Sequence, residues 1–211
     1  MAHIKKLNFL KNHKDLVDEN YGMVAVPTFS DKMDKDLEEL FKSQNKTGKV
    51  GDLVFEIDNN SRIVYYGLGD SSDKTAENFR RAAGEVVGYA LQHKYSDIAV
   101  ECPVTDEGEY FCQAFAEGLI LSSYRFLDYF TDERGEYHLK SITMVDACNQ
   151  DAAKKGAIIA SAVCDSRDLG NHPGNVTTPT RLANFAKEVG KKGNMKVTAV
   201  SYTHLTLPTT Y

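Results

Sequence analysis

The 211-residue chain contains no tryptophan, only five prolines and four cysteines, and no long uninterrupted apolar run. A membrane-spanning helix needs about 20 mostly apolar residues, so the sequence predicts no membrane partner. The first residues are positively charged but no apolar segment follows them, and no secretory signal is expected. The cysteines form no C-x-x-C pair, which predicts reduced thiols and a cytoplasmic location rather than a disulfide framework or a zinc site.

The chain also has no excess of positive charge. The chain has 25 Lys and Arg against 30 Asp and Glu, a net charge of -5, so the sequence predicts no nucleic-acid partner. Its 42% hydrophobic and 26% charged residues are close to the composition of soluble globular domains and argue against disorder or a fibrous repeat. At about 150 residues per domain, the length predicts one domain and a remainder.

Short runs rich in β-branched and aromatic residues predict strands. They lie at residues 23–26, 53–57, 62–66, 98–100 and 142–145. The second and third runs flank an Asp/Asn-rich turn and are expected to form a hairpin. The first run is expected to end at Pro27. The aromatic and charged stretch 124–137 indicates an exposed connection or a hairpin.

Helices are predicted where apolar residues recur with a period of 3.6. These stretches cover approximately residues 34–43, 79–91, 107–122 and 151–169. Gly118 inside the third stretch costs about 1 kcal/mol against alanine, so we expect a neighbouring backbone to approach closely there. The alternation of strands and helices predicts an α/β fold with a mixed or mostly parallel sheet flanked by helices.

A boundary is predicted between Gly170 and Thr178, because the Pro173-Gly174 pair cannot continue a helix. Thr178 is suited to be the N-cap of a new helix with Pro179 at its first position. This helix is expected to turn four apolar residues inward, namely Leu182, Ala183, Ala186 and Val189, and to lead into a strand over Met195–Ala199. We therefore predict a first domain over residues 1–165 and the start of a second α/β domain over residues 166–199.

The end of the chain, residues 200–211, differs in composition from the rest. From Val200 to Thr210 it has four threonines and no Asp, Glu, Lys or Arg. A strand and a turn would suit such residues, but the string resembles the translation of a transposon-end adapter used in preparing sequencing libraries. We favour the second interpretation and expect residues 200–211 to be a non-native tail.

No catalytic constellation is recognisable from the residue types and their spacing. Gly67 and Gly69 follow a strand, but Ser72 stands where a dinucleotide-binding fingerprint has a third glycine. A plain turn is therefore the favoured interpretation. The six histidines include no i, i+4 pair, and we interpret His93 as a helix-end residue and His172 as a turn residue.

The remaining candidates also have simple structural interpretations. The acidic cluster between Asp31 and Glu39 suits a helix N-terminus better than a metal site. Arg167 and Asp168 suit an ion pair or a helix cap. Three cysteines suit small core positions, and these are Cys102, Cys112 and Cys164. We therefore assign no catalytic, cofactor-binding or metal-binding residue.

Four stretches of the sequence, taken together, resemble the motifs of a known protein family. The most specific runs from Ser166-Arg167-Asp168-Leu169 through Asn171–Asn175 to Thr178-Pro179 and Leu182-Ala183. The other three are Glu117–Leu119 with Ser123–Phe126, Tyr66–Gly69 before a Glu77–Leu91 helix, and the Gly156–Ala160 helix. In order and spacing they resemble the leucyl aminopeptidase family, also called cytosol aminopeptidases. In that family an R-D-L-x-N-x-P-x-N-x-x-T-P-x-x-L-A segment joins the first domain to the catalytic one.

The resemblance implies a macro-domain-like first domain of a hydrolase that removes N-terminal residues from peptides with two divalent ions, manganese or zinc. It also implies a homohexamer in the cytoplasm. The family's metal ligands and catalytic residues lie beyond the junction, so none is carried over to residues 1–199. We expect the 211-residue chain alone to bind no catalytic metal pair and to be inactive. We also expect residues 178–199 to expose their apolar faces and to be poorly ordered.

Two interpretations from other classes stay open. The chain could be a stand-alone macro-type module that binds ADP-ribose or a nucleotide through the Gly67–Ser72 loop. It could also be a structural domain whose task is the packing of subunits. A carboxylate- and lysine-rich metal domain after Ala199 would favour the aminopeptidase over both.

Overall fold

The computed structural model describes residues 3–11, 21–58, 61–105, 108–132, 135–147 and 149–200. The chain divides into two compact units, Met1–Asp165 and Ser166–Tyr211. The division falls inside one continuous helix, Gln150–Asn171. The expected non-native tail lies outside the described residues from residue 201 onward, so its assignment stays a prediction.

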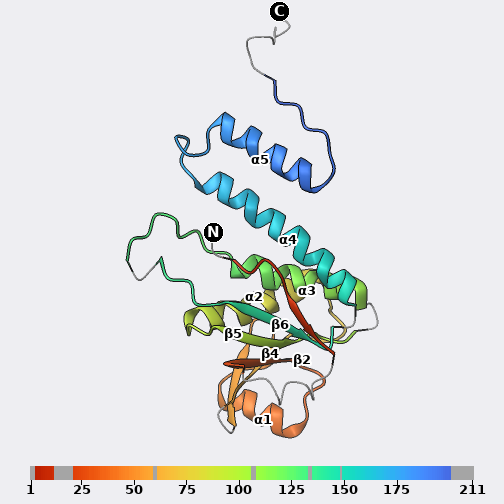
Figure 1. Cartoon of the computed structure of the whole chain (residues 1–211). Helices are drawn as coiled ribbons and strands as arrows, with labels where there is room; N and C mark the ends of the chain where they lie inside the picture. The colour runs from red at the N-terminus through yellow and green to blue at the C-terminus, as the bar shows by residue number, and fades with distance from the viewer. Residues whose placement is uncertain are drawn as a thin grey trace, which may run out of the picture. The chain divides into compact units, whose positions relative to one another are not determined.

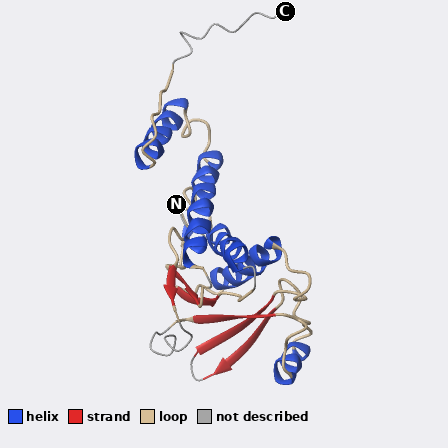
Figure 2. Ribbon diagram, turned by 90° about the vertical axis from the view of Figure 1, so that its right-hand side faces the viewer, coloured by secondary structure: helices blue, strands red, loops and turns tan. Residues whose placement is uncertain are grey.

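The first unit contains a six-stranded mixed sheet in the order β1-β6-β5-β2-β4-β3 (Figures 1 and 2). The strands are β1 Asn8–Leu10, β2 Met23–Thr28, β3 Leu53–Asp58, β4 Ser61–Gly67, β5 Asp97–Glu101 and β6 Ser141–Val145. Neighbouring strands are parallel except in the β3–β4 hairpin, which is antiparallel. The predicted α/β class and the hairpin are confirmed, and the turn residues Asn59 and Asn60 lie outside the described residues.

Two strands differ from the expectation. β2 does not stop before Pro27 but continues to Thr28, with Pro27 opposite Tyr66 of β4. The ladder between β2 and β5 ends at Ala25, so at Pro27 the strand has a neighbour on one side only, as an edge strand has. β1 is not among the predicted strands, because three residues are too few to display a period of two.

Four helices accompany this sheet, namely α1 Lys35–Ser43, α2 Ala76–Gln92, α3 Gly108–Ser123 and α4 Gln150–Asn171, the last of which continues into the second unit. They confirm the predicted helices, with ends shifted by a few residues. The apolar stripe of α2 is buried: Phe79, Ala82, Ala83, Val86, Val87 and Ala90 are each at most 1% exposed. Figures 1 and 2 show α2 and α3 together over one face of the sheet, with α1 away from them. The core therefore lies between the sheet and the α2–α3 layer.

Glycines set the spacing of the helix layer. A Cβ atom at Gly118 of α3 would lie 2.5 Å from the carbonyl oxygen of Arg80 on α2. A Cβ atom at Gly156 of α4 would collide with the carbonyl oxygen of Gln113 on α3. The close backbone approach that Gly118 predicts is confirmed, and Gly156 serves the same purpose between α4 and α3.

The stretch between α3 and β6 is a connection and not a hairpin, since the described part of residues 124–137 contains no paired strands. The hydroxyl of Tyr137 donates a hydrogen bond to the carbonyl of Ser123 at 2.8 Å. This contact ties the connection to the end of α3.

The second unit contains the end of α4, a turn and helix α5 Pro179–Lys192. The side chain of Thr178 accepts a hydrogen bond from the backbone N–H of Arg181 at 3.3 Å, and Pro179 occupies the first turn. The predicted cap and helix start are confirmed. The predicted strand over Met195–Ala199 is wrong, because a strand needs a neighbour to pair with and the described residues of this unit contain no strand.

The apolar residues of α5 were expected to face inward, and they do not. Leu182 is 46% exposed and Val189 is 41% exposed, and Met195 after the helix is 58% exposed. The apolar faces of this segment are thus exposed, as the resemblance led us to expect. None of the helices within the described residues is both long enough and apolar enough to span a bilayer.

Candidate functional site

The carboxyl ends of the parallel strands are the usual place for a ligand in an α/β fold. Here the Gly67–Ser72 loop leads from the end of β4 to α2. Its first amides already have partners within the chain: the N–H of Gly67 donates to the Asp52 carbonyl at 2.9 Å, and that of Leu68 to Thr28 at 2.9 Å. The N–H of Gly69 donates to the Gly48 carbonyl at 3.0 Å. A phosphate group would find none of these three donors available.

Carboxylates accept hydrogen bonds from the two serines of the loop, Ser71 and Ser72. The N–H of Ser71 donates to Asp31 at 2.9 Å, and the Ser71 hydroxyl donates to the same carboxylate at 2.5 Å. The N–H and hydroxyl of Ser72 donate to Asp70 at 2.8 and 2.6 Å. The hydrogen bonds from Ser71 hold the pKa of Asp31 below its ordinary value, so negative charge stands where a phosphate would have to bind.

The turn formed by residues 46–52 packs against this loop. One Asp52 carboxylate oxygen accepts the backbone N–H groups of Thr47, Gly48 and Lys49 at 3.0, 3.1 and 3.1 Å. Partial burial raises the pKa of Asp52, but the N–H of Thr47 and the ammonium of Lys46 outweigh burial and hold the pKa below its ordinary value. Gly67 thus serves backbone packing, because a Cβ atom there would collide with this turn. Gly69 instead supplies a positive φ of 79°.

The acidic cluster is divided between the loop and α1. Asp34 is the N-cap of α1 and accepts the N–H of Leu37 at 2.8 Å. Glu38 pairs with Lys42 at 2.8 Å, while Asp31 bonds to Ser71 of the distant loop. Among the described residues, no group of three or more His, Cys, Asp or Glu is placed to hold a metal ion.

The histidines and the junction residues are scattered over both units. His93 is the C-cap of α2 and its ring lies 4.1 Å from that of Tyr89. His172 follows α4 and donates its backbone N–H to the carbonyl of Asp168 at 3.1 Å. The Asp168 side chain is buried at 2% exposed. His13 and His204 lie outside the described residues.

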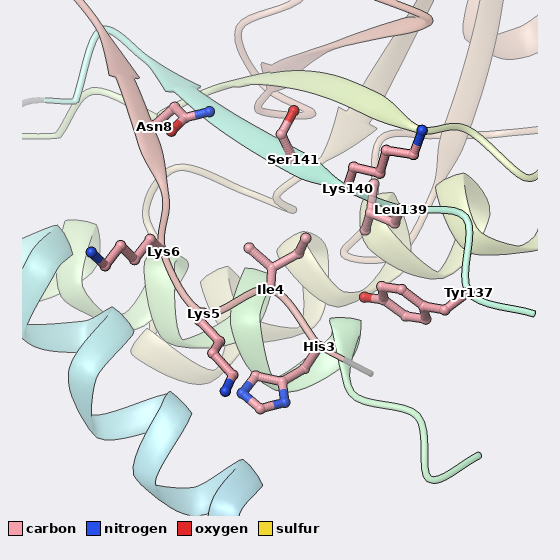
Figure 3. A pocket seen from close by; sticks show the side chains of 9 residues that line it. All are labelled: His3, Ile4, Lys5, Lys6, Asn8, Tyr137, Leu139, Lys140 and Ser141. Carbon is pink, nitrogen blue, oxygen red and sulfur yellow. The ribbon is translucent and has the colours of Figure 1, made fainter. Parts of the chain in front are cut away.

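An open cavity of about 520 Å³ lies beside the N-terminal segment (Figure 3). It is lined by His3, Ile4, Lys5, Lys6, Asn8, Tyr137, Leu139, Lys140 and Ser141. The sequence pattern does not indicate it, because the two segments that line it are more than 120 residues apart. In Figure 3 the ammonium groups of Lys5, Lys6 and Lys140 point in different directions and do not converge on one point.

The Glu117-Gly118 pair has a clear structural role. Glu117 is 7% exposed and accepts hydrogen bonds from Arg80 Nε at 2.8 Å and from Gln113 Nε2 at 2.8 Å. Gly118 beside it allows α2 to approach. This motif fastens α2 to α3, and it does so at a buried position where an unpaired carboxylate would be costly.

The three cysteines expected in the core are buried. The structure adds a relation that their spacing does not reveal: Cys102 Sγ lies 3.8 Å from Cys112 Sγ. One thiol follows β5 and the other is on α3. A sequence separation of ten residues carries no signal for this contact, which depends on how α3 folds back over the sheet.

The profile of the cytosol aminopeptidase family, N-terminal domain, matches residues 17–133. A protein named probable cytosol aminopeptidase from Desulforapulum autotrophicum is 32% identical over 146 residues, covering 62% of this chain and 28% of that protein. A protein of the same name from Treponema denticola is 26% identical over 185 residues, covering 84% of this chain and 39% of its own length. The chain therefore spans about 28–39% of the length of these relatives.

Solved structures share the fold. The bottromycin maturation enzyme BotP superposes with a TM-score of 0.72 at 22% identity, covering 84% of this chain and 38% of that chain. A mutant of tomato leucine aminopeptidase gives a TM-score of 0.71 at 20% identity, covering 90% of this chain and 43% of that chain.

Proposed function

The chain belongs to the cytosol aminopeptidase family, and from this premise we propose that it is the N-terminal portion of a metal-dependent enzyme that releases N-terminal amino acids from peptides. The observation that carries this proposal is the family match over residues 17–133. The junction segment Ser166–Ala183 supports it independently, because that segment lies outside the matched range. Residues 166–199 would then be the start of the catalytic domain.

The chemistry is assigned to the part of the enzyme beyond this chain. Two divalent ions, manganese or zinc, would activate a water molecule and polarise the scissile carbonyl. A structure of BotP in complex with Mn is among the structural relatives and supports metal dependence. By the same resemblance, the ligands of these ions would lie beyond residue 199.

The described unit would contribute a rigid folded body rather than reacting groups. Its strand-end loop has its amides and carboxylates paired with one another, as the Ser71–Asp31 contact illustrates. We propose peptides as substrates, a homohexamer as the assembly and the cytoplasm as the location, each by family resemblance.

The test uses two proteins, the 211-residue chain and the product of the gene read beyond codon 199. Both are assayed with a leucyl-anilide substrate in the presence of Mn²⁺ or Zn²⁺. We expect turnover by the longer protein and none by the 211-residue chain. A natural stop codon after Tyr211, or turnover by the short chain, would contradict the proposal.

The alternative, a module for ADP-ribose or a nucleotide, is not favoured by the Gly67–Ser72 loop. Five backbone N–H groups of this loop, those of Gly67, Leu68, Gly69, Ser71 and Ser72, are already bonded within the chain. Calorimetry of the 211-residue chain with ADP-ribose at millimolar concentration is expected to show no binding heat. A saturable heat signal that disappears in Ser71→Ala would restore the alternative.

A further inference from the structure

Two buried thiols meet where β5 passes into the loop before α3. Cys102 directly follows β5 and Cys112 lies in the first half of α3. Their Sγ atoms are 3.8 Å apart, and each residue is 1% exposed. This separation is close to van der Waals contact for two sulfur atoms, so no other atom lies between them.

The protein fixes both thiols through regular structure. The backbone N–H of Cys102 donates to the carbonyl of Val145 at 2.8 Å, which continues the pairing of β5 with β6. The Cys112 thiol lies 3.2 Å from the carbonyl oxygen of Asn149, next to the start of α4. The two sulfurs are therefore presented by the sheet and by a packed helix.

We propose that Cys102 and Cys112 are a site of reversible oxidation and form a disulfide that links the end of β5 to α3. A disulfide needs the sulfurs about 2.0 Å apart, so they must approach by roughly 2 Å, which side-chain rotation with a small backbone shift can provide. The proposal concerns the first unit and is independent of the aminopeptidase function.

The oxidant is a small hydroperoxide such as hydrogen peroxide, because a bulky reagent cannot reach residues that are 1% exposed. One thiol loses its proton and attacks the peroxide as a thiolate, the O–O bond breaks, and a sulfenic acid and hydroxide form. The hydroxide takes up the released proton and becomes the first water. The second thiol then attacks this sulfur, forms the S–S bond and releases a second water. Two sulfurs are oxidised, one peroxide is reduced, and both thiol protons end in water. A dithiol reductant reverses the step by exchange.

The adjacent thiol decides the outcome of the first oxidation. A lone sulfenic acid can be oxidised further to an irreversible state, whereas Cys112 and Cys102 lie within reach of one another. The bridge would close the short loop between β5 and α3 and so restrict the unfolded chain. We expect the oxidised protein to unfold at a higher temperature than the reduced one.

The experiment treats the folded 211-residue chain with hydrogen peroxide and counts thiols in denaturant before and after. Four cysteines are present, and we expect two to remain reactive, with all four recovered after dithiothreitol. Peptide mapping of the unaltered chain is expected to show a Cys102–Cys112 linked peptide. Because it needs no substitution, this measurement does not depend on a variant folding.

A double variant, Cys148→Ala with Cys164→Ala, keeps only the proposed pair and should still lose both thiols within one chain. Cys112→Ala is the matched control and should form no linked peptide containing Cys102. The proposal is overturned if mapping finds a different pair, if the bridge joins two chains, or if Cys102 and Cys112 stay reduced or pass to sulfinic acid.

Discussion

At the scale of single residues, Asp52 shows how one carboxylate organises the strand-end region. Its side chain is 17% exposed and lies 3.3 Å from the Lys46 ammonium, and it accepts three consecutive backbone N–H groups. The turn that it holds contacts the Gly67–Gly69 segment. The glycine segment that suggests a phosphate loop in the sequence is therefore bound by hydrogen bonds to the turn that Asp52 holds.

We predict that Asp52→Asn lowers the free energy of unfolding by about 1–2 kcal/mol at neutral pH, because charged hydrogen bonds at a partly buried site are lost. The folded-state pKa of Asp52 is lowered from 3.8. As pH falls, the unfolded state therefore takes up the proton first. The stability that Asp52 provides is fully present above the unfolded-state pKa of 3.8 and is lost as pH falls through the lower folded-state pKa.

Urea titrations of both proteins between neutral and acidic pH would measure this. The difference between the two curves should shrink below the ordinary Asp pKa of 3.8. Glu39→Gln, which removes an exposed carboxylate of α1, is the control and should change stability little. A difference that stays constant down to the acid-unfolded state would be inconsistent with the assigned role.

At the scale of secondary-structure elements, helix spacing is controlled by glycines. Gly118 lets α3 touch the backbone of α2, and the Arg80–Glu117 ion pair at 2.8 Å crosses the same contact.

One side chain pairs with the backbone of the edge strand β3. The Gln44 amide donates to the Phe55 carbonyl at 3.0 Å and accepts the N–H of Phe55 at 3.2 Å. The amide thus replaces the strand neighbour that β3 lacks there.

We predict opposite effects for two glycine-to-alanine changes in neighbouring helices. Gly118→Ala should destabilise the protein by about 1–3 kcal/mol through overpacking, since its Cβ would lie 2.5 Å from the Arg80 carbonyl oxygen. Gly88→Ala of α2 is the matched control: its Cβ would meet nothing within 4 Å, so helix propensity should add up to about 1 kcal/mol. The unfolding temperatures of both variants would be compared with that of the unaltered chain. An equal rise in unfolding temperature for the two variants would refute the packing argument.

At the scale of the whole molecule, the first unit has its own hydrophobic core, whereas the second unit exposes apolar side chains. The largest buried side chains, Tyr66 and Phe41 among them, belong to the first unit. In the second unit Leu182, Val189 and Met195 are between 41% and 58% exposed. An apolar helix face without cover is easily unfolded locally and then cleaved.

We predict that limited proteolysis cuts the 211-residue chain first within residues 172–200 and leaves the first unit as a resistant product. Mass spectrometry of the fragments identifies the sites. The longer gene product should be protected in the same stretch, because its following residues would cover α5. Equal resistance of both units in the short chain would count against an uncovered second unit.

Several features could be predicted from the sequence because they are local. The stripe from Phe79 to Leu91 specifies α2, the Asp/Asn turn specifies the hairpin, and Thr178-Pro179 specifies the start of α5. Features that depend on distant neighbours could not be predicted in the same way. β2 passes through Pro27 because of which strand lies beside it, and residues 195–199 form no strand because none of the described residues of their unit pairs with them.

The sequence by itself determined the fold class, the helices and, through the junction motif, the family, since these follow from periodicity and from short motifs that are read along the chain. Only the tertiary structure decided that the backbone N–H groups of Gly67, Leu68, Gly69 and Ser71 are paired with carbonyls and a carboxylate from other segments. It also brought Cys102 and Cys112 together. The physical reason is that hydrogen-bond partners and contacts between elements depend on positions in space, which spacing along the chain does not specify.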